Sequence, residues 1–315
     1  MEKIYQRIKK PNTEISLPKG NVSFDAVLGS YYQDFTEAIH HYEGEYFGQF
    51  DEKGIPMFGY DEDAIYNQIY IIQYGLIAHD LILKNVDIEL NKHRMEICVE
   101  WLENNVVEFE GTYIWRNDFP TKRFELLPGW VSSMYQGQII SLFLRYGQFT
   151  NQLDKYTQLS KKVFDYFYIP YEKGGVMRKD KEGNFWLEEY PSPTPSFVLN
   201  GFVYTLFGII DLYRVSKDES VKKMMDDCFS TLKNSIHKYD AGYWSIYDQF
   251  LQERATKYYH KNIHIPLLEI LYELTNESIF LKYKKKWEWQ LNSTFCNSFV
   301  KIMYRVQPRI RRILN

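Results

Sequence analysis

The stretch "SFVLNGFVYTLFGIIDLYRVSKDESVKKMMDDCFSTLKNSIHKY", residues 196–239, decides the fold of this protein. Its first half, residues 196–216, is apolar on nearly every side, whereas residues 218–239 carry lysines and aspartates between apolar positions at helical spacing. A helix covered on both sides by neighbours is apolar all round, and a helix that meets solvent is amphipathic. The stretch therefore predicts an inner helix paired with an outer helix.

Three further pairs of predicted helices repeat this alternation. They span residues 64–83 with 92–106, 132–150 with 151–169, and 262–276 with 277–293. Successive pairs of this kind curl into an α/α toroid, in which inner-helix ends and connecting loops line a central cleft. The predicted fold class is all-α, an incomplete (α/α)6-like barrel of helical hairpins with short β-hairpin inserts lining the cleft.

No long low-complexity linker interrupts the sequence, so one domain over residues 1–315 is expected, with an N-terminal arm (1–24) and a basic C-terminal tail (294–315). The tail admits two interpretations: contact with an anionic membrane face, or a terminal helix that frays, which we favour. The first residues lack the apolar segment of a signal peptide, and no run of about 18 apolar residues occurs. A cytoplasmic location is therefore expected.

A β-hairpin is predicted just before the decisive stretch. In "GGVMRKDKEGNFWLEEY", residues 174–190, a Lys-Glu-Gly-Asn turn separates two alternating runs. Glu188 and Glu189 close the second run, and the next residues, "PSPTP", hold the backbone extended before Ser196, a candidate helix N-cap. Strand alternation points the two carboxylates to opposite sides, so we expect Glu188 to be solvated. A rigidly placed carboxylate suits an active site, although a plain connector also uses prolines.

Composition narrows the function classes. The net charge is −3 over 315 residues, so nucleic acid is not an expected partner. Aromatic residues make up 17% of the sequence, with 27 tyrosines, a composition that suits sugar-binding clefts, although core packing accounts for most of them.

Neither the cysteines nor the histidines predict a metal site. Cys98, Cys228 and Cys296 are scattered without CxxC spacing and are interpreted as reduced core residues. His260 and His264 have a spacing that can bind metal on one helix face, but no third ligand has suitable spacing. They are therefore interpreted as core or cleft histidines, and no metal is expected.

A resemblance adds to these patterns. "WLEEYPSPTPSFVLNGFVYTLFGIIDLY", residues 186–213, resembles the signature of the D-glucuronyl C5-epimerase family in its C-terminal catalytic domain. Four further segments agree in order: "IYIIQYGL" (69–76), "LLPGWVSSMYQGQIISLFLR" (126–145), "YDAGYWSIYDQF" (239–250) and "YYHKNIHIPLLEIL" (258–271). The resemblance spans residues 65–289. It implies an α/α toroid and a cofactor-independent C5-epimerase of uronic acid residues, of the D-glucuronate to L-iduronate type, in a polysaccharide or its lipid-linked precursor.

This chemistry needs one group to remove the C5 proton, another to return a proton on the opposite face, and donors that hold the developing negative charge. The resemblance implies that Glu189, Tyr190, Tyr247 and Tyr259 surround the reacting sugar. We assign Glu189 and Tyr259 as the opposed acid/base pair, with Tyr190 and Tyr247 as hydrogen-bond donors. Tyr258 rivals Tyr259 for the catalytic role.

Other residues are candidates for binding the sugar. Trp130 is placed to stack on it; the remaining candidates are Gln73, Tyr74, Gln136, Gln138, Asn200, His260 and His264. For each of them core packing or a backbone hydrogen bond is an alternative role. Tyr190 likewise has a core-filling alternative.

The sequence also departs from the family pattern. Animal members carry a β-rich domain and a membrane anchor, and neither is expected here. Their dimers imply a homodimer only by analogy. In the family a Tyr-His pair is followed by a second histidine. The spacing between these two histidines, here His260 and His264, is one residue longer than in the family. Where the family tends to have an arginine after Tyr-Asp, this sequence has Gln249 and Phe250. Two rival functions stay open: a polysaccharide lyase or glycoside hydrolase, and a non-catalytic glycan-binding protein.

Overall fold

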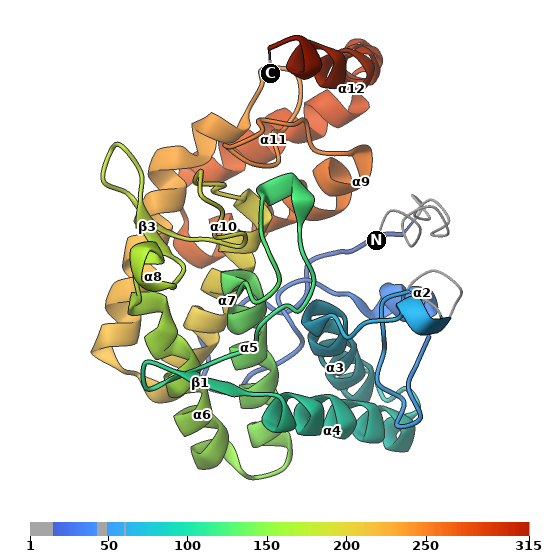
Figure 1. Cartoon of the computed structure of the whole chain (residues 1–315), viewed down its shortest axis with the longest axis vertical. Helices are drawn as coiled ribbons and strands as arrows, with labels where there is room; N and C mark the ends of the chain where they lie inside the picture. Colours follow the sequence, from blue (N-terminus) through green and yellow to red (C-terminus); the bar gives the residue numbers. More distant parts are fainter. Residues whose placement is uncertain (1–14, 43–48, 60, 315) are drawn as a thin grey trace.

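The computed structural model describes residues 15–42, 49–59 and 61–314, and these residues are mostly helical (Figure 1). The first 14 residues of the expected N-terminal arm and Asn315 of the tail lie outside this description. The described helices form the four predicted pairs. They are α3 (Gln68–Leu83) with α4 (Ile88–Asn104), α5 (Ser133–Phe149) with α6 (Leu153–Asp165), α7 (Leu199–Ser216) with α8 (Glu219–Ser235), and α10 (Ile265–Thr275) with α11 (Ser278–Asn292).

Shorter elements connect these pairs. Two antiparallel hairpins are formed by β1 (Val107–Phe109) with β2 (Thr112–Ile114) and by β3 (Met177–Lys179) with β4 (Phe185–Leu187). One-turn helices include α2 (Ile39–Tyr42) and α9 (Lys257–Tyr259), and α12 (Thr294–Leu314) follows the last pair. The architecture confirms the predicted α/α toroid with hairpin inserts. Whether the chain forms a single domain stays a prediction.

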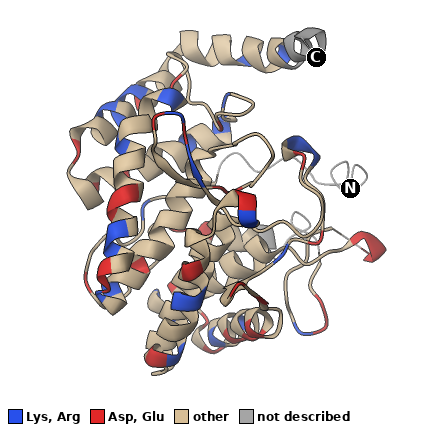
Figure 2. Ribbon diagram, turned by 60° about the vertical axis from the view of Figure 1, so that its left-hand side comes forward, with Lys and Arg blue, Asp and Glu red and all other residues tan. Residues whose placement is uncertain are grey.

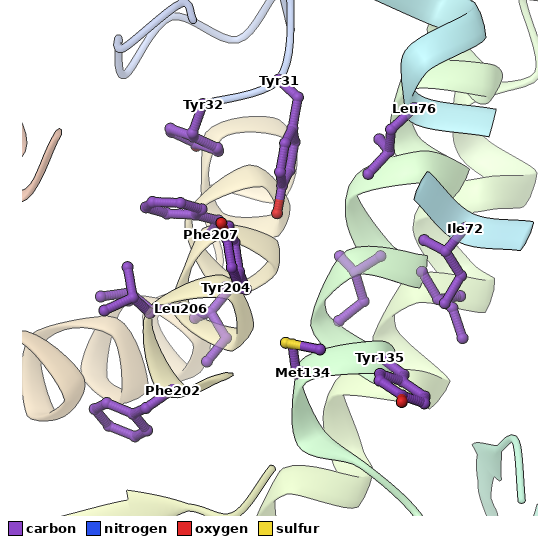
Figure 3. Close-up of a cluster of buried hydrophobic side chains, with 14 of the residues drawn as sticks. Tyr31, Tyr32, Ile72, Leu76, Met134, Tyr135, Phe202, Tyr204, Leu206 and Phe207 are labelled. Carbon is purple, nitrogen blue, oxygen red and sulfur yellow. The ribbon is translucent and has the colours of Figure 1, made fainter. Parts of the chain in front are cut away.

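The inner helices α3, α5 and α7 pack side by side, and α5 and α7 are buried along almost their whole length. Two glycines allow the close approach of α5 and α7. A Cβ at Gly137 would lie 2.6 Å from the Cα of Thr205, and one at Gly208 would lie 2.0 Å from the carbonyl oxygen of Gly137. Figure 3 shows apolar side chains of the core that these inner helices contribute, among them Leu76 of α3 and Met134 of α5.

A buried ionic network holds the far ends of the inner helices to the segment before α2. Asp211 of α7 accepts hydrogen bonds from Arg145 of α5 (2.5 Å), Tyr32 (2.9 Å) and Arg214 (3.2 Å). Arg214 also donates to backbone carbonyls, including that of Val27 at 2.9 Å. Every charged group here is almost fully buried, so each depends on the others for compensation.

Removing Asp211 should therefore strongly destabilise the folded protein. In an Asp211→Ala variant, Arg145 and Arg214 lose their shared counter-ion, and we expect the free energy of unfolding to fall by about 3–5 kcal/mol. Urea denaturation followed by circular dichroism measures the change. Asp226→Ala is the matched control, since Asp226 forms an exposed ion pair with Lys222 on α8, and its midpoint should hardly move. Equal shifts in the two variants would contradict this account.

Two local details differ from the sequence prediction. Ser196 does not cap α7, because the helix begins at Leu199 after Val198, and no side chain caps it. Instead the Ser196 hydroxyl donates to Glu188. The first residues of the predicted helix 262–276 belong to a π-helical turn, His260–His264, and α10 begins only at Ile265. A π-helical turn accommodates one extra residue within a helix.

The predicted burial of the three cysteines is confirmed, since Cys98, Cys228 and Cys296 all lie in the core. Within the described ranges, no helix combines the length and apolar character needed to cross a bilayer.

Candidate functional site

The hairpin β3–β4 delivers Glu188 and Glu189 to the end of the inner helix α7. The Glu188 carboxylate accepts hydrogen bonds from the backbone N–H of Ser196 (3.0 Å), the Ser196 hydroxyl (2.6 Å) and the backbone N–H of Phe197 (3.0 Å). Its side chain is 1% exposed, so the expectation of a solvated Glu188 was wrong. The cause is the proline-rich connector, which turns back so that its own N–H groups need a buried acceptor.

Glu189 is also buried, at 2% exposed, and its Oε2 has no hydrogen-bond partner among the described residues. Burial raises the pKa of this carboxyl to about 8, although a hydrogen bond from Tyr190 and the charge of Arg123 act in the opposite direction. Gly201 of α7 makes the space, because a Cβ there would lie 2.1 Å from Oε2. The sequence places a glycine where only a glycine allows this carboxyl to sit.

Three tyrosines surround Glu189. Burial, and next the Glu189 charge, raise the pKa of Tyr190, Tyr247 and Tyr259 alike. The rings of Tyr247 and Tyr259 meet edge to face with centroids 5.2 Å apart. Each of the three tyrosines is partly exposed, whereas Glu189 is buried. The structure thus brings together the four residues assigned to catalysis, three partly exposed tyrosines and one buried acid.

Aromatic packing fixes the orientation of Tyr190. Its ring stacks on Phe124 at 4.1 Å with an interplanar angle of 10°, and it meets Trp130 at 5.4 Å. Trp130 donates its indole N–H to the carbonyl of Phe119 at 2.8 Å and is itself buried. Trp130 therefore contacts the site through Tyr190, and its buried ring supports that tyrosine.

His260 and His264 follow Tyr259 in the sequence, and the ring of His264 lies 6.3 Å from that of Tyr259. Both Nδ1 atoms lie 2.8 Å from the hydroxyl of Ser245, and His260 stacks on Trp244 with centroids 3.9 Å apart. Burial lowers the pKa of His260 to about 4 and that of His264 to about 3, so both rings are neutral. In the described part of the chain, no third His, Cys, Asp or Glu joins them to hold a metal ion. They are the first and last residues of the π-helical turn that follows Tyr259.

The remaining predicted binding residues divide into two groups. Gln136, Gln138 and Asn200 are buried on α5 and α7, and their side chains carry amide atoms that lack a protein partner within the described ranges. Asn200 directly precedes the glycine beneath Glu189. On α3, Gln73 is partly buried, whereas the Tyr74 ring is buried beneath the guanidinium of Arg94 at 5.5 Å.

Arg123 belongs to the site and was not predicted from the sequence. Its guanidinium lies 5.0 Å above the ring of Tyr247 and pairs with Asp248 (3.1 Å) and Glu253 (2.8 Å). The side chain is 41% exposed, so it reaches solvent beside the tyrosines. Through its pair with Asp248, Arg123 supplies a cation next to Gln249 and Phe250, near which the family tends to have an arginine. The only signal in the sequence is a basic loop shortly before the Pro-Gly-Trp segment.

Fold and site together define a helical toroid with a buried acid ringed by tyrosines. The structure is similar to the crystal structure of a D-mannose isomerase, with a TM-score of 0.50 and 13% identity, covering 80% of this chain and 68% of that one. The model of the family described as D-glucuronyl C5-epimerase C-terminus matches residues 110–289. Because this match covers more than half of the chain, the protein belongs to that family.

Two relatives show how far the similarity extends. An uncharacterized protein of Methanocaldococcus jannaschii is 31% identical over 179 residues, which are 55% of this chain and 56% of that protein. The D-glucuronyl C5-epimerase of Caenorhabditis elegans is 29% identical over 217 residues, which are 63% of this chain but 35% of that enzyme. The chain thus matches only about half, or less, of the length of these relatives.

Proposed function

We propose that this protein is a cofactor-independent C5-epimerase that interconverts D-glucuronate and L-iduronate residues in a glycan or its lipid-linked precursor. The observation that carries the proposal is Glu189, a buried carboxyl of raised pKa, next to partly exposed tyrosines in a chain of the epimerase family. A cytoplasmic location and a homodimer stay predictions.

The reaction begins when a base removes the C5 proton and the electron pair of the C–H bond moves into the adjacent carboxylate. A carboxyl in a dry environment is a stronger base than one in water, which suits a weakly acidic C–H. Glu189 takes the proton in one direction, and Tyr259 donates a proton to the other face of C5. In the reverse direction the two exchange roles, and no atom is gained or lost.

The intermediate carries additional negative charge on the substrate carboxylate, and this charge needs donors that are already in place. The hydroxyls of Tyr190 and Tyr247 are neutral, since their pKa values lie well above the usual range. They donate hydrogen bonds to the carboxylate, and Arg123 contributes its charge at the partly exposed edge of the site.

The decisive experiment incubates the protein with an unsulfated heparosan-like glycan in heavy water and observes C5 of the uronate by NMR. The epimerase predicts deuterium at C5 together with signals of the second epimer. Absorbance from an unsaturated uronate would instead identify a lyase, new reducing ends a hydrolase, and tight binding without exchange a glycan-binding protein.

The rate of exchange should depend on pH through Glu189. Its pKa is raised to about 8, so below that pH the carboxyl is protonated, the acid/base pair carries two protons, and neither member can act as base. We expect kcat/KM to rise about tenfold per pH unit up to pH 7 and to level off above pH 8. A pH series from 6 to 9 with one glycan measures this. A flat profile across this range would contradict the assignment.

Arg123 should affect binding more than turnover. An Arg123→Gln variant loses one charge-assisted contact to the substrate carboxylate, and we expect KM to rise about 10- to 100-fold with a smaller change in kcat. Lys122→Gln is the control, since Lys122 is the exposed neighbour on the same turn. Equal changes in both variants would show that only the general charge of this loop matters.

A further inference from the structure

The last helix, α12, is docked on the molecule along only one of its sides. Cys296 and Val300 are buried against Trp244, and the hydroxyl of Tyr304 donates to the carbonyl of Ala255. Gln307 donates to the carbonyl of Gln252 at 3.0 Å. These contacts hold α12 along the end of the molecule, at the top of Figure 1.

A second side of α12 presents large apolar side chains to solvent. Phe295 is 72% exposed and Ile302 55%, whereas Phe299, whose ring meets that of Tyr243 with centroids 4.6 Å apart, is 36% exposed. At positions i, i+4 and i+7 these residues line one face of a helix, and the rings of Phe295 and Phe299 stack 6.0 Å apart. We call this face the apolar stripe. A contiguous exposed apolar surface of this kind marks an interaction site.

Cations accompany the apolar stripe without any acid. Lys301 and Arg305 are exposed and follow each other at i and i+4. Residues 294–315 contain five Lys and Arg and neither Asp nor Glu. Figure 2 shows blue and no red on the described part of α12, whereas the other outer helices carry both colours. A helix with an apolar face flanked by cations is typical of proteins that lie on anionic membranes.

The combination of charge and apolar surface selects one partner. A second copy of α12 would meet the first with like charge and no acid to compensate it, which costs free energy. Nucleic acid would satisfy the cations but would leave two phenylalanines and an isoleucine without a suitable environment. An anionic lipid surface accommodates both, because acyl chains take up the apolar side chains and headgroups meet the cations.

We propose that α12 binds the surface of an anionic membrane, with Phe295, Phe299 and Ile302 entering the interface and Lys301 and Arg305 contacting headgroups. In this arrangement α12 lies parallel to the bilayer surface and attaches the protein to it. The inference does not depend on the proposed function, because no residue of α12 belongs to the candidate site.

Vesicle flotation tests the proposal with the full chain. Vesicles of phosphatidylcholine alone are compared with vesicles in which about a third of the lipid is phosphatidylglycerol, at low and high salt. We expect binding only to the anionic vesicles, weakened by salt. A Lys301→Gln, Arg305→Gln double variant should lose about thirtyfold in affinity, and a Phe295→Ser, Ile302→Ser double variant at least tenfold.

Matched controls distinguish a specific effect of the α12 substitutions from a general loss of charge or apolar surface. Lys222→Gln with Lys223→Gln removes two exposed cations on α8, and Leu83→Ser with Leu90→Ser removes exposed apolar side chains on α3 and α4. Both should bind like the unmodified protein. The proposal would be overturned by equal binding to both kinds of vesicle, or by full binding of both α12 variants. A smaller mass of these variants in light scattering would also overturn it, because α12 would then join copies of the chain.

Discussion

Replacing Glu189 with Gln should lower the rate of C5 exchange by about 10³-fold, the contribution expected of a positioned acid/base group. The amide fills the same space above Gly201 but cannot accept the C5 proton. In the proposed mechanism Glu189 exchanges roles with Tyr259, so the loss should be equal for D-glucuronate and L-iduronate substrates. Exchange from heavy water, followed by NMR for each epimer, measures both rates.

The stability of this variant provides an internal check. A carboxyl whose pKa is raised from 4.5 to about 8 by folding destabilises the folded state progressively as the pH rises between these values. The Gln variant should therefore be as stable as the unmodified protein at pH 5 and more stable at pH 9. Glu182→Gln, in the exposed turn of the same hairpin, should change neither exchange nor its pH dependence. Retained exchange in Glu189→Gln would remove Glu189 from the mechanism.

A Tyr259→Phe variant should lose about 10²- to 10³-fold in exchange, because only the proton-carrying hydroxyl is removed. The phenyl ring keeps its edge-to-face contact with Tyr247, so the packing around Glu189 is preserved. Circular dichroism and the unfolding midpoint should therefore be unchanged. The ratio of the two rates then measures what the Tyr259 hydroxyl contributes, including its hydrogen bond with Tyr247.

Tyr258→Phe is the matched control for this prediction. The two tyrosines are neighbours with ring centroids 6.0 Å apart, and both are partly exposed. We expect Tyr258→Phe to exchange C5 within about threefold of the unmodified protein. A large loss in Tyr258→Phe with normal exchange in Tyr259→Phe would transfer the donor role to Tyr258.

The sequence by itself determined the helix pairs, because inner and outer helices differ in local apolar periodicity, and it determined the hairpin through its turn residues. Its motif around residues 186–213 also placed Glu189 among the tyrosines by resemblance to the epimerase family. These features depend on residues close together in the chain, where spacing and side-chain type determine the outcome.

Only the tertiary structure decided the environment of each candidate group. Glu188 is buried because the connector folds back on it, and Ser196 binds Glu188 where local pattern predicted a helix cap. Arg123 reaches Tyr247 across more than a hundred residues of sequence. The raised pKa of Glu189 comes from desolvation, which arises only when distant segments pack together and exclude water. No pattern within a short stretch of sequence contains that information, because burial is a property of the assembled fold.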